Sequence, residues 1–398
     1  MLAIALFGAA VMQRLLLVML ALLIAIQAHA RAPVAAFASL PSELMPVLSP
    51  DGGKIASVIS FQGQQIVLVR MIGATEKPNL IYRTDNKDVR IQWIDWANKH
   101  RLFIAIRAPS KRFGLDTTET RLVSVLHDGN DLVNMVPVKS SDWMPQFQDH
   151  VIDLLPADPD HVLMSLALSA TRSGLRNGVF KVNVNNGKRK RVQVETVDVV
   201  QWLTDRQHRV RLSVKLKKGI GTIAVRAPNE KKFSVLWRFP WASLEHVEPL
   251  GFGGDPNELY VLAYHNDHKA VFRVDLASAD LRRELVFALP GTDVHRQLLY
   301  SSVAGEVVGV RDRSGGQYHV WHSSYLAFSK ALSKALPETN NTLISMSENE
   351  RRYVVLASSD TIPGDLMFGD RDRGELMAFG QLYPQLNDVD LVEKQAIT

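Results

Sequence analysis

The sequence predicts an all-β fold, a seven-bladed β-propeller with four antiparallel strands in each blade. One observation is a strand-like apolar segment that recurs seven times, beginning at Ile55, Leu102, Val162, Val210, Leu259, Val307 and Val354. Another is the interval between these segments, which by subtraction is 47, 60, 48, 49, 48 and 47 residues. Repeats of roughly 40 to 50 residues made of short strands are typical of propellers, whose units bury their apolar faces by stacking around an axis.

The second repeat illustrates the division into strands. We expect its first strand to line the central channel, and turns rich in Asp, Asn and Gly to separate the four. The expected strands are Val89–Trp96, Leu102–Arg107, Arg121–Leu126 and Leu132–Val136. Similar patterns place Val179–Val184 and Val271–Leu276 in the outer hairpins of the third and fifth repeats.

The last repeat also supplies four strands of its own, at Thr342–Met346, Tyr353–Ser358, Asp365–Phe368 and Glu375–Phe379. No strand is left over to complete a blade from the other end of the chain. We therefore expect no strand-exchange closure, and a ring held shut only by packing between the first and last blades. Almost no helix is expected beyond residue 30.

The interval of 60 residues is the one irregularity in the repeat. It reflects additional residues around Pro109–Thr118 and Ser140–His150. We expect both segments to form surface loops.

The N-terminus predicts a secretory signal peptide over residues 1–30. Leu15–Ile26 is a short apolar run that follows Arg14 and precedes the small-residue site Ala28-His29-Ala30. We expect export to the periplasm or the medium with cleavage after Ala30. An N-terminal extension (31–44), the propeller (45–383) and a C-terminal linker (384–398) would then follow. An uncleaved anchor is the alternative, because residues 2–10 are also apolar, and translation could start at Met12.

Composition excludes several kinds of site. The chain has no cysteine, which removes disulfides, thiol nucleophiles and thiolate metal ligands. Its formal charge is +5, with basic residues at Lys188–Arg191 and at Lys215, Lys217 and Lys218. The first run follows the hairpin dipeptide Asn186-Gly187, so we interpret it as a solvated strand. No nucleic-acid partner is expected for an exported protein.

Catalytic motifs are missing from the sequence. It contains no G-x-S-x-G elbow, H-E-x-x-H helix, P-loop or dinucleotide-binding glycine fingerprint. We therefore assign no catalytic, cofactor-binding or metal-binding residue and expect no cofactor. His265-Asn266-Asp267-His268 is the densest metal candidate, but H-x-x-H lacks a third ligand at a defined spacing, so we interpret it as an exposed turn.

Two further groups of residues have alternative interpretations. Aromatic side chains on expected strands could stack on sugars, but packing between blades is the simpler interpretation. These residues are Trp93, Trp96, Trp202, Trp237 and Trp241. Arg107, Lys111 and Arg112 could face a ligand near the long second-repeat segment, whereas solvated loop charge is the default interpretation.

Both ends of the expected propeller resemble a known family. The opening Phe37–Pro41 and Val47–Ala56, and the tail Leu382–Leu386 and Glu393–Thr398, are similar to exported bacterial enzymes of the prolyl oligopeptidase family. The similarity is to the acylaminoacyl-peptidase and dipeptidyl-aminopeptidase branch, and Ser358–Gly364 resembles its last-blade pattern. It covers the signal peptide and the entire propeller.

The resemblance implies a propeller without strand exchange that, in the relatives, covers the active site and restricts access to short peptides. Their serine, aspartate and histidine lie in an α/β-hydrolase domain that would begin after Thr398, so no catalytic residue can be carried over. We expect a non-catalytic propeller from a truncated or split oligopeptidase, with a hydrolase domain encoded separately or lost. The alternative is a stand-alone periplasmic propeller that binds a protein or ligand as a scaffold. Membrane contact is expected only through the signal segment.

Overall fold

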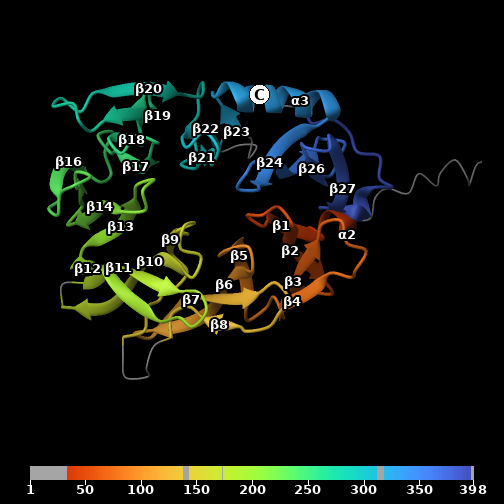
Figure 1. The fold of residues 1–398 in the computed structure, drawn as a ribbon, viewed down its shortest axis with the longest axis horizontal. Helices are drawn as coiled ribbons and strands as arrows, with labels where there is room; N and C mark the ends of the chain where they lie inside the picture. The colour runs from red at the N-terminus through yellow and green to blue at the C-terminus, as the bar shows by residue number, and fades with distance from the viewer. Residues whose placement is uncertain (1–33, 138–142, 173, 312–317, 396–398) are drawn as a thin grey trace, which may run out of the picture.

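Seven antiparallel sheets surround one axis in the computed structural model, which describes residues 34–137, 143–172, 174–311 and 318–395 (Figure 1). The predicted seven-bladed propeller is therefore confirmed. The predicted signal peptide lies outside the described residues. Within the described ranges, no helix is long and apolar enough to cross a membrane.

The strands of each sheet follow one another in sequence, with the first strand innermost (Figure 1). Blade 1 contains β1 (Glu43–Leu48), β2 (Lys54–Phe61), β3 (Gln64–Met71) and β4 (Asn79–Thr84). Blade 2 contains β5 (Arg90–Trp96), β6 (Arg101–Arg112), β7 (Leu115–Leu126) and β8 (Val133–Asn134). Blade 3 contains β9 (Val151–Asp153), β10 (His161–Thr171), β11 (Gly174–Asn183) and β12 (Arg189–Val197).

The remaining blades continue around the ring. Blade 4 contains β13 (Val199–Thr204), β14 (Val210–Lys217), β15 (Ile220–Val225) and β16 (Ser234–Pro240). Blade 5 contains β17 (Glu248–Phe252), β18 (Glu258–His265), β19 (His268–Asp275) and β20 (Arg283–Phe287). Blade 6 contains β21 (Leu298–Tyr300), β22 (Val307–Arg311) and β23 (Tyr318–Val320). Blade 7 contains β24 (Asn340–Met346), β25 (Arg352–Ser358), β26 (Asp365–Asp370) and β27 (Glu375–Gln381).

The hydrophobic core is distributed between the blades. Side chains of β2 and β3, such as Ala56 and Val67, pack against Ile94, Trp96 and Leu102 of blade 2. The second strand of a blade is covered on both faces, which explains why it reads as a continuous apolar run. This is why the second strands carried the repeat signal in the sequence.

Blade 6 departs from the expected pattern, because its described residues form three strands followed by α3 (Ser323–Ala335). The helix lies on the outer rim of the blade, and Phe328 and Leu332 pack against Tyr353 and Val355 of blade 7 (Figure 1). Apolar residues at helical spacing favour this helix over a fourth strand. The expectation of almost no helix beyond residue 30 is wrong at this position.

The expected loop at Pro109–Thr118 is also wrong, because the segment extends a hairpin. β6 and β7 remain paired as far as Arg112 and Leu115. Phe113 and Gly114 make the turn with φ of 52° and 81°, as a two-residue hairpin turn requires. Residues 143–150 form no helix or strand, as expected for a loop.

The ring closes without strand exchange in the described residues, as predicted, but packing is not the only force that holds it. Leu48 and Ile55 pack against Val354 and Phe368 across the seam between blades 1 and 7. Hydrogen bonds also cross this seam, among them those from Leu48 N to Ser345 Oγ (3.0 Å), from Glu348 N to Pro50 O (2.8 Å) and from Arg352 Nη1 to Gly52 O (3.0 Å).

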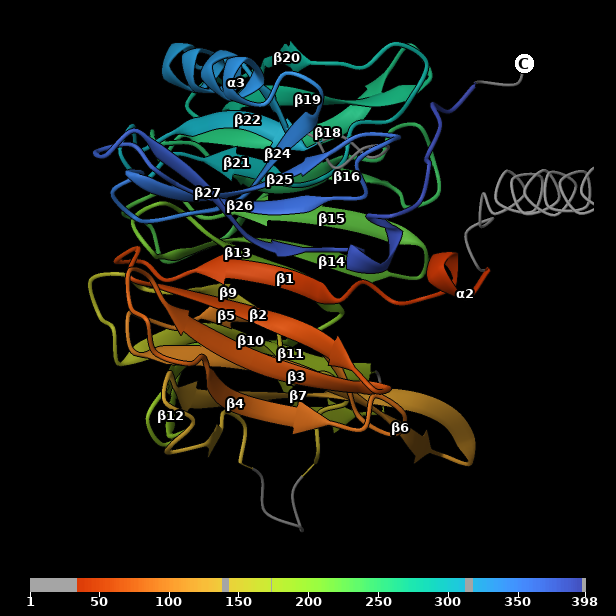
Figure 2. The ribbon, with the colours of Figure 1, turned by 90° about the vertical axis from the view of Figure 1, so that its right-hand side faces the viewer.

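Both ends of the described chain lie on one face of the ring, which we name the termini face (Figure 2). Gln385 of the short helix η1 (Pro384–Leu386) donates to the carbonyl of Ala36 in α2 (Val34–Phe37) at 3.3 Å. The segment before β1 pairs with the end of blade 7 through Ser42 N and Leu382 O at 2.6 Å. Because neighbouring strands are antiparallel, hairpins between second and third strands reach this face. Turns between first and second strands form the opposite face, the turn face.

Candidate functional site

The turn face carries a cavity of about 940 Å³ at the mouth of the central channel. It is lined by the turns of blades 1, 2, 3, 6 and 7 that connect the first strand to the second. Side chains in these turns fix the backbone locally. Asn98 Oδ1 accepts hydrogen bonds from the N–H groups of His100 (2.8 Å) and Arg101 (2.9 Å), and Asp51 Oδ1 accepts one from Gly53 N (3.0 Å). The mouth is therefore built from ordered turns.

Asp95 on the innermost strand β5 projects into this cavity. The side chain is exposed to solvent, and desolvation by the protein around it raises its pKa to about 6. A hydrogen bond of 2.8 Å from Trp96 N opposes the shift. A neighbour in the cavity, His100, has its pKa lowered by burial and by the nearby Lys99 and Lys54.

The termini face carries exposed apolar side chains. On its hairpin between β6 and β7, Phe113 is 89% exposed and Leu115 is 72% exposed. Further exposed apolar residues on the hairpins and connections of this face are Phe61, Phe147, Ile220 and Leu244, and beside them on the N-terminal segment Phe37 and Leu40. Apolar side chains that gather on one face mark surfaces that contact another molecule or domain.

The three basic residues singled out in blade 2, Arg107, Lys111 and Arg112, have different surroundings in the structure. Arg112 donates from Nε to Glu119 Oε1 at 2.8 Å, and Lys111 lies 3.6 Å from Asp116 at the exposed hairpin tip. Arg107 lines a separate cavity of about 520 Å³ on the termini face, beside Arg90, which is its partner in the strand register. Only Arg107 therefore has the position of a ligand-facing residue.

The tryptophans serve mainly to join blades. Trp96 is buried and donates from Nε1 to Val47 O of blade 1 at 3.1 Å. Trp202 is buried and donates to Asn177 O of blade 3 at 3.3 Å. Trp237 and Trp241 pack in the cluster between blades 4 and 5, and Trp93 donates to Asp149 Oδ2 at 3.1 Å. The structure thus favours packing over sugar stacking.

His265 and His268 face each other at the hairpin of blade 5, as the turn interpretation predicted. His265 lies edge-on to Phe272, and His268 Nδ1 is 3.6 Å from Asp293. The described residues contain no cluster of three potential metal ligands. Lys188–Arg191 enters the outermost strand β12, where Arg191 pairs with Glu195 at 3.3 Å.

Asp95 and the apolar residues of the termini face could not be selected from sequence. Asp95 occurs within an alternating strand, and nothing local shows that its side chain points into a cavity. The exposed residues of the termini face become a group only when the blades bring their hairpins together.

No protein-family model and no curated protein matches this sequence. Among solved structures, the chain is similar to a puromycin-hydrolysing peptidase of Mycobacterium tuberculosis, with 11% identity and a TM-score of 0.50 over 88% of this chain and 55% of that one. It is also similar to prolyl oligopeptidase B of Galerina marginata, with 10% identity and a TM-score of 0.49 over 87% and 52% of the two chains. A third similar structure comes from an analysis of two prolyl endopeptidases. Its identity is 12% and its TM-score is 0.46, over 86% of this chain and 49% of that one.

The chain spans about half the length of these structures, with 55%, 52% and 49% of each covered. At 11% identity, the similarity with a TM-score of 0.50 shows a shared fold and nothing beyond it. The expected resemblance is confirmed at the level of the fold.

Proposed function

We propose that this chain is the non-catalytic propeller of an exported serine peptidase of the prolyl oligopeptidase family, and that an α/β-hydrolase domain docks on its termini face. The observation that carries the proposal is that both ends of the described chain leave from the face that carries the highly exposed Phe113 and Leu115. A domain joined to either end would meet this face first. Burial of residues such as Phe113 and Leu115 would stabilise the contact by about 25 cal/mol per Å² of apolar surface removed from water.

In this arrangement the propeller restricts the substrate. A hydrolase active site facing the termini face would be covered by the ring, so that substrates would enter through the channel or through a gap between the covering surfaces. A folded protein would be excluded by the ring, and a short peptide would be admitted. The propeller thereby supplies selection by size, and the hydrolase domain supplies the nucleophile, base and oxyanion hole.

A photo-crosslinking experiment tests the docking face. Phe113 is replaced by p-benzoylphenylalanine in the cells that make the protein, and a fluorophosphonate probe marks serine hydrolases. Val303, which is also exposed but lies on the turn face, takes the same substitution as the control. We expect illumination to join position 113, and not position 303, to peptides of a probe-labelled hydrolase domain. Adducts formed at 303, or at 113 only with other propellers, would refute the docking face.

Two further parts of the proposal have simple tests. The described chain on its own should take no fluorophosphonate label and should not hydrolyse peptides or esters, because it has no G-x-S-x-G elbow. Export should yield a mature N-terminus at Arg31, because Ala28 and Ala30 are the small residues that signal peptidase needs. Uncut, membrane-embedded protein would show that residues 15–26 act as an anchor.

A stand-alone scaffold is the second candidate function, and the cavity of about 940 Å³ on the turn face favours it. A scaffold needs no partner on the termini face, so its isolated propeller should be monomeric and soluble. An unpartnered docking face should instead promote self-association. Light scattering of the purified chain, and of a Phe113→Ser/Leu115→Ser double variant, distinguishes the two functions.

A further inference from the structure

The seven blades provide an internal comparison for the innermost strands. In each blade, one inner-strand residue pairs with the third residue of the second strand. In blade order these residues are Val47, Asp95, Asp153, Leu203, Gly251, Leu299 and Ser345. Five of the seven are uncharged, so the fold itself does not require a charge at this position.

The two aspartates differ in their partners. Asp153 accepts from His208 Nδ1 at 2.8 Å and from Leu155 N at 3.0 Å, so its carboxylate joins two blades. Asp95 accepts only from the N–H of its neighbour Trp96, and no cationic side chain of the described residues lies within ion-pair distance. Asp95 therefore presents an unpaired carboxylate to the cavity, and such a charge is available to a cationic ligand.

We propose that Asp95 binds the primary ammonium group of a short peptide in the turn-face cavity. The volume of about 940 Å³ is large enough for a short peptide, and Leu48, Pro156 and Met346 give it an apolar wall. An ammonium group would supply the counter-ion that the protein does not. The site lies opposite the proposed docking face, so its test does not depend on a hydrolase domain.

The other charged groups around the cavity favour a cation. Those lining it are Asp51, Lys99, His100, Arg101, Asp160 and Glu348. Asp51 is paired with Lys54 at 3.3 Å and Arg101 with Asp131 at 2.7 Å. Lys99 is then opposed by Asp95, Asp160 and Glu348. Burial and the neighbouring lysines lower the pKa of His100, which favours its neutral form.

Calorimetry with three peptides tests the site. The probes are Ala-Ala-Ala-amide with a free N-terminus, acetyl-Ala-Lys-Ala-amide, and the uncharged acetyl-Ala-Gln-Ala-amide. At about pH 8 we expect at least one charged peptide to bind about tenfold more tightly than the neutral one. The preferred charged peptide identifies the source of the ammonium group. Equal binding of all three, or no binding of either charged peptide, would overturn the proposal.

Substitutions locate the contact. Asp95→Asn keeps the shape of the side chain and should abolish the preference for charge, and lowering the pH to about 5 should reduce that preference in the parent. Glu348→Gln removes a charge from the rim of the same cavity and should retain most of the preference. An equal loss of the preference in both variants would mean that it arises from the combined charge of the groups around the cavity. That result would refute the specific role of Asp95.

Discussion

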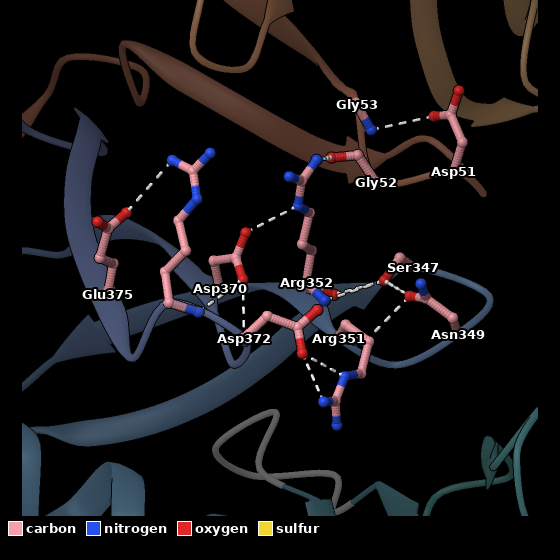
Figure 3. Close-up of polar contacts among 11 residues, drawn as sticks. Asp51, Gly52, Gly53, Ser347, Asn349, Arg351, Arg352, Asp370, Asp372 and Glu375 are labelled. Carbon is pink, nitrogen blue, oxygen red and sulfur yellow. Dashed lines mark hydrogen bonds and ion pairs between the residues drawn. The ribbon is translucent and has the colours of Figure 1, made fainter.

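The guanidinium of Arg352 in blade 7 donates a hydrogen bond of 3.0 Å to the carbonyl of Gly52 in blade 1, across the seam where the chain is not continuous (Figure 3). The same relationship occurs elsewhere in the ring. Lys54 Nζ donates to Lys99 O at 3.0 Å between blades 1 and 2, and Arg211 Nη1 donates to Pro256 O at 2.9 Å between blades 4 and 5. A cation at the start of a second strand thus anchors the turn of the next blade, and at the seam this contact substitutes for a covalent connection.

Replacing Arg352 should weaken ring closure. Arg352→Ala removes the bond to Gly52 O and the bond of 2.9 Å from Nε to Asp370 Oδ2, and we expect a loss of about 1–3 kcal/mol in the free energy of unfolding. The neighbouring Arg351 is the matched control, because its side chain is 55% exposed and pairs with the exposed Asp372. Arg351→Ala should cost less than about 1 kcal/mol. Equal urea midpoints for the two variants would contradict a special role for the seam contact.

Asp370 should make the seam sensitive to acid. Its side chain is 6% exposed, and burial alone would raise its pKa. Hydrogen bonds from Arg352 and from the N–H groups of Arg373 and Asp372 outweigh burial and lower the pKa below its usual value. A carboxyl whose pKa is lowered on folding contributes stability above its unfolded pKa and loses it as the pH falls through the folded value.

Asp370→Asn should therefore be less stable than the parent at neutral pH, and the difference should shrink below about pH 4. Urea unfolding of both proteins across this range measures it. A difference that is constant with pH would mean that the charge of Asp370 does not contribute.

The repeat made most of the fold predictable. Second strands such as β2 and β18 are covered on both sides by neighbouring blades, so their apolar runs mark the period directly. Blade 6 was mispredicted because Tyr325, Phe328 and Leu332 need the surface of blade 7 to specify a helix, and that surface is distant in sequence. The hairpin at Phe113 was mispredicted because polar, Thr-containing strands that extend beyond the core lack an apolar signal.

The candidate sites were less predictable than the fold. Arg107 could be named from sequence as a potential ligand contact, but its position beside Arg90 depends on strand register. Asp95 could not be distinguished from Asp153, because the difference lies in His208, which comes from the next blade. A side chain that differs from its counterparts only by lacking an ion-pair partner cannot be recognised from the sequence. Only the structure shows which residues it contacts.

Close contact between Gly369 and Tyr353 leaves no space for a side chain at the glycine position. A Cβ at Gly369 would lie 2.1 Å from the ring of Tyr353, the residue opposite it in the strand register. Tyr353 is packed between Phe328 and Val355, so it cannot move aside easily. We expect Gly369→Ala to destabilise the propeller by about 1–3 kcal/mol. Gly53→Ala is the control, because its Cβ would meet nothing closer than 3.4 Å, and thermal melts of the two variants should differ accordingly.

Asp95 should make the protein less stable where it is charged. Its pKa is 3.8 in the absence of burial and about 6 in the folded protein, so the folded state binds the proton more tightly. Stability is then highest when Asp95 is protonated, and it decreases as the pH rises from about 4 to above 6. Asn resembles the protonated carboxyl. At about pH 8, Asp95→Asn should therefore be more stable than the parent by about 1 kcal/mol, a value discounted because channel water screens the charge.

At about pH 3, below the pKa of Asp95 in both states, the Asp95→Asn variant and the parent should have similar free energies of unfolding, since both side chains are then mostly uncharged. Asp267→Asn, on the exposed hairpin turn of blade 5, controls for the loss of a carboxylate and should change stability little at either pH. Urea titrations at the two pH values provide the measurement. A gain in stability at high pH, together with a loss of ammonium binding, would show that Asp95 is retained for its ligand at the expense of the fold. A less stable Asp95→Asn variant at high pH would instead show that the carboxylate supports the structure.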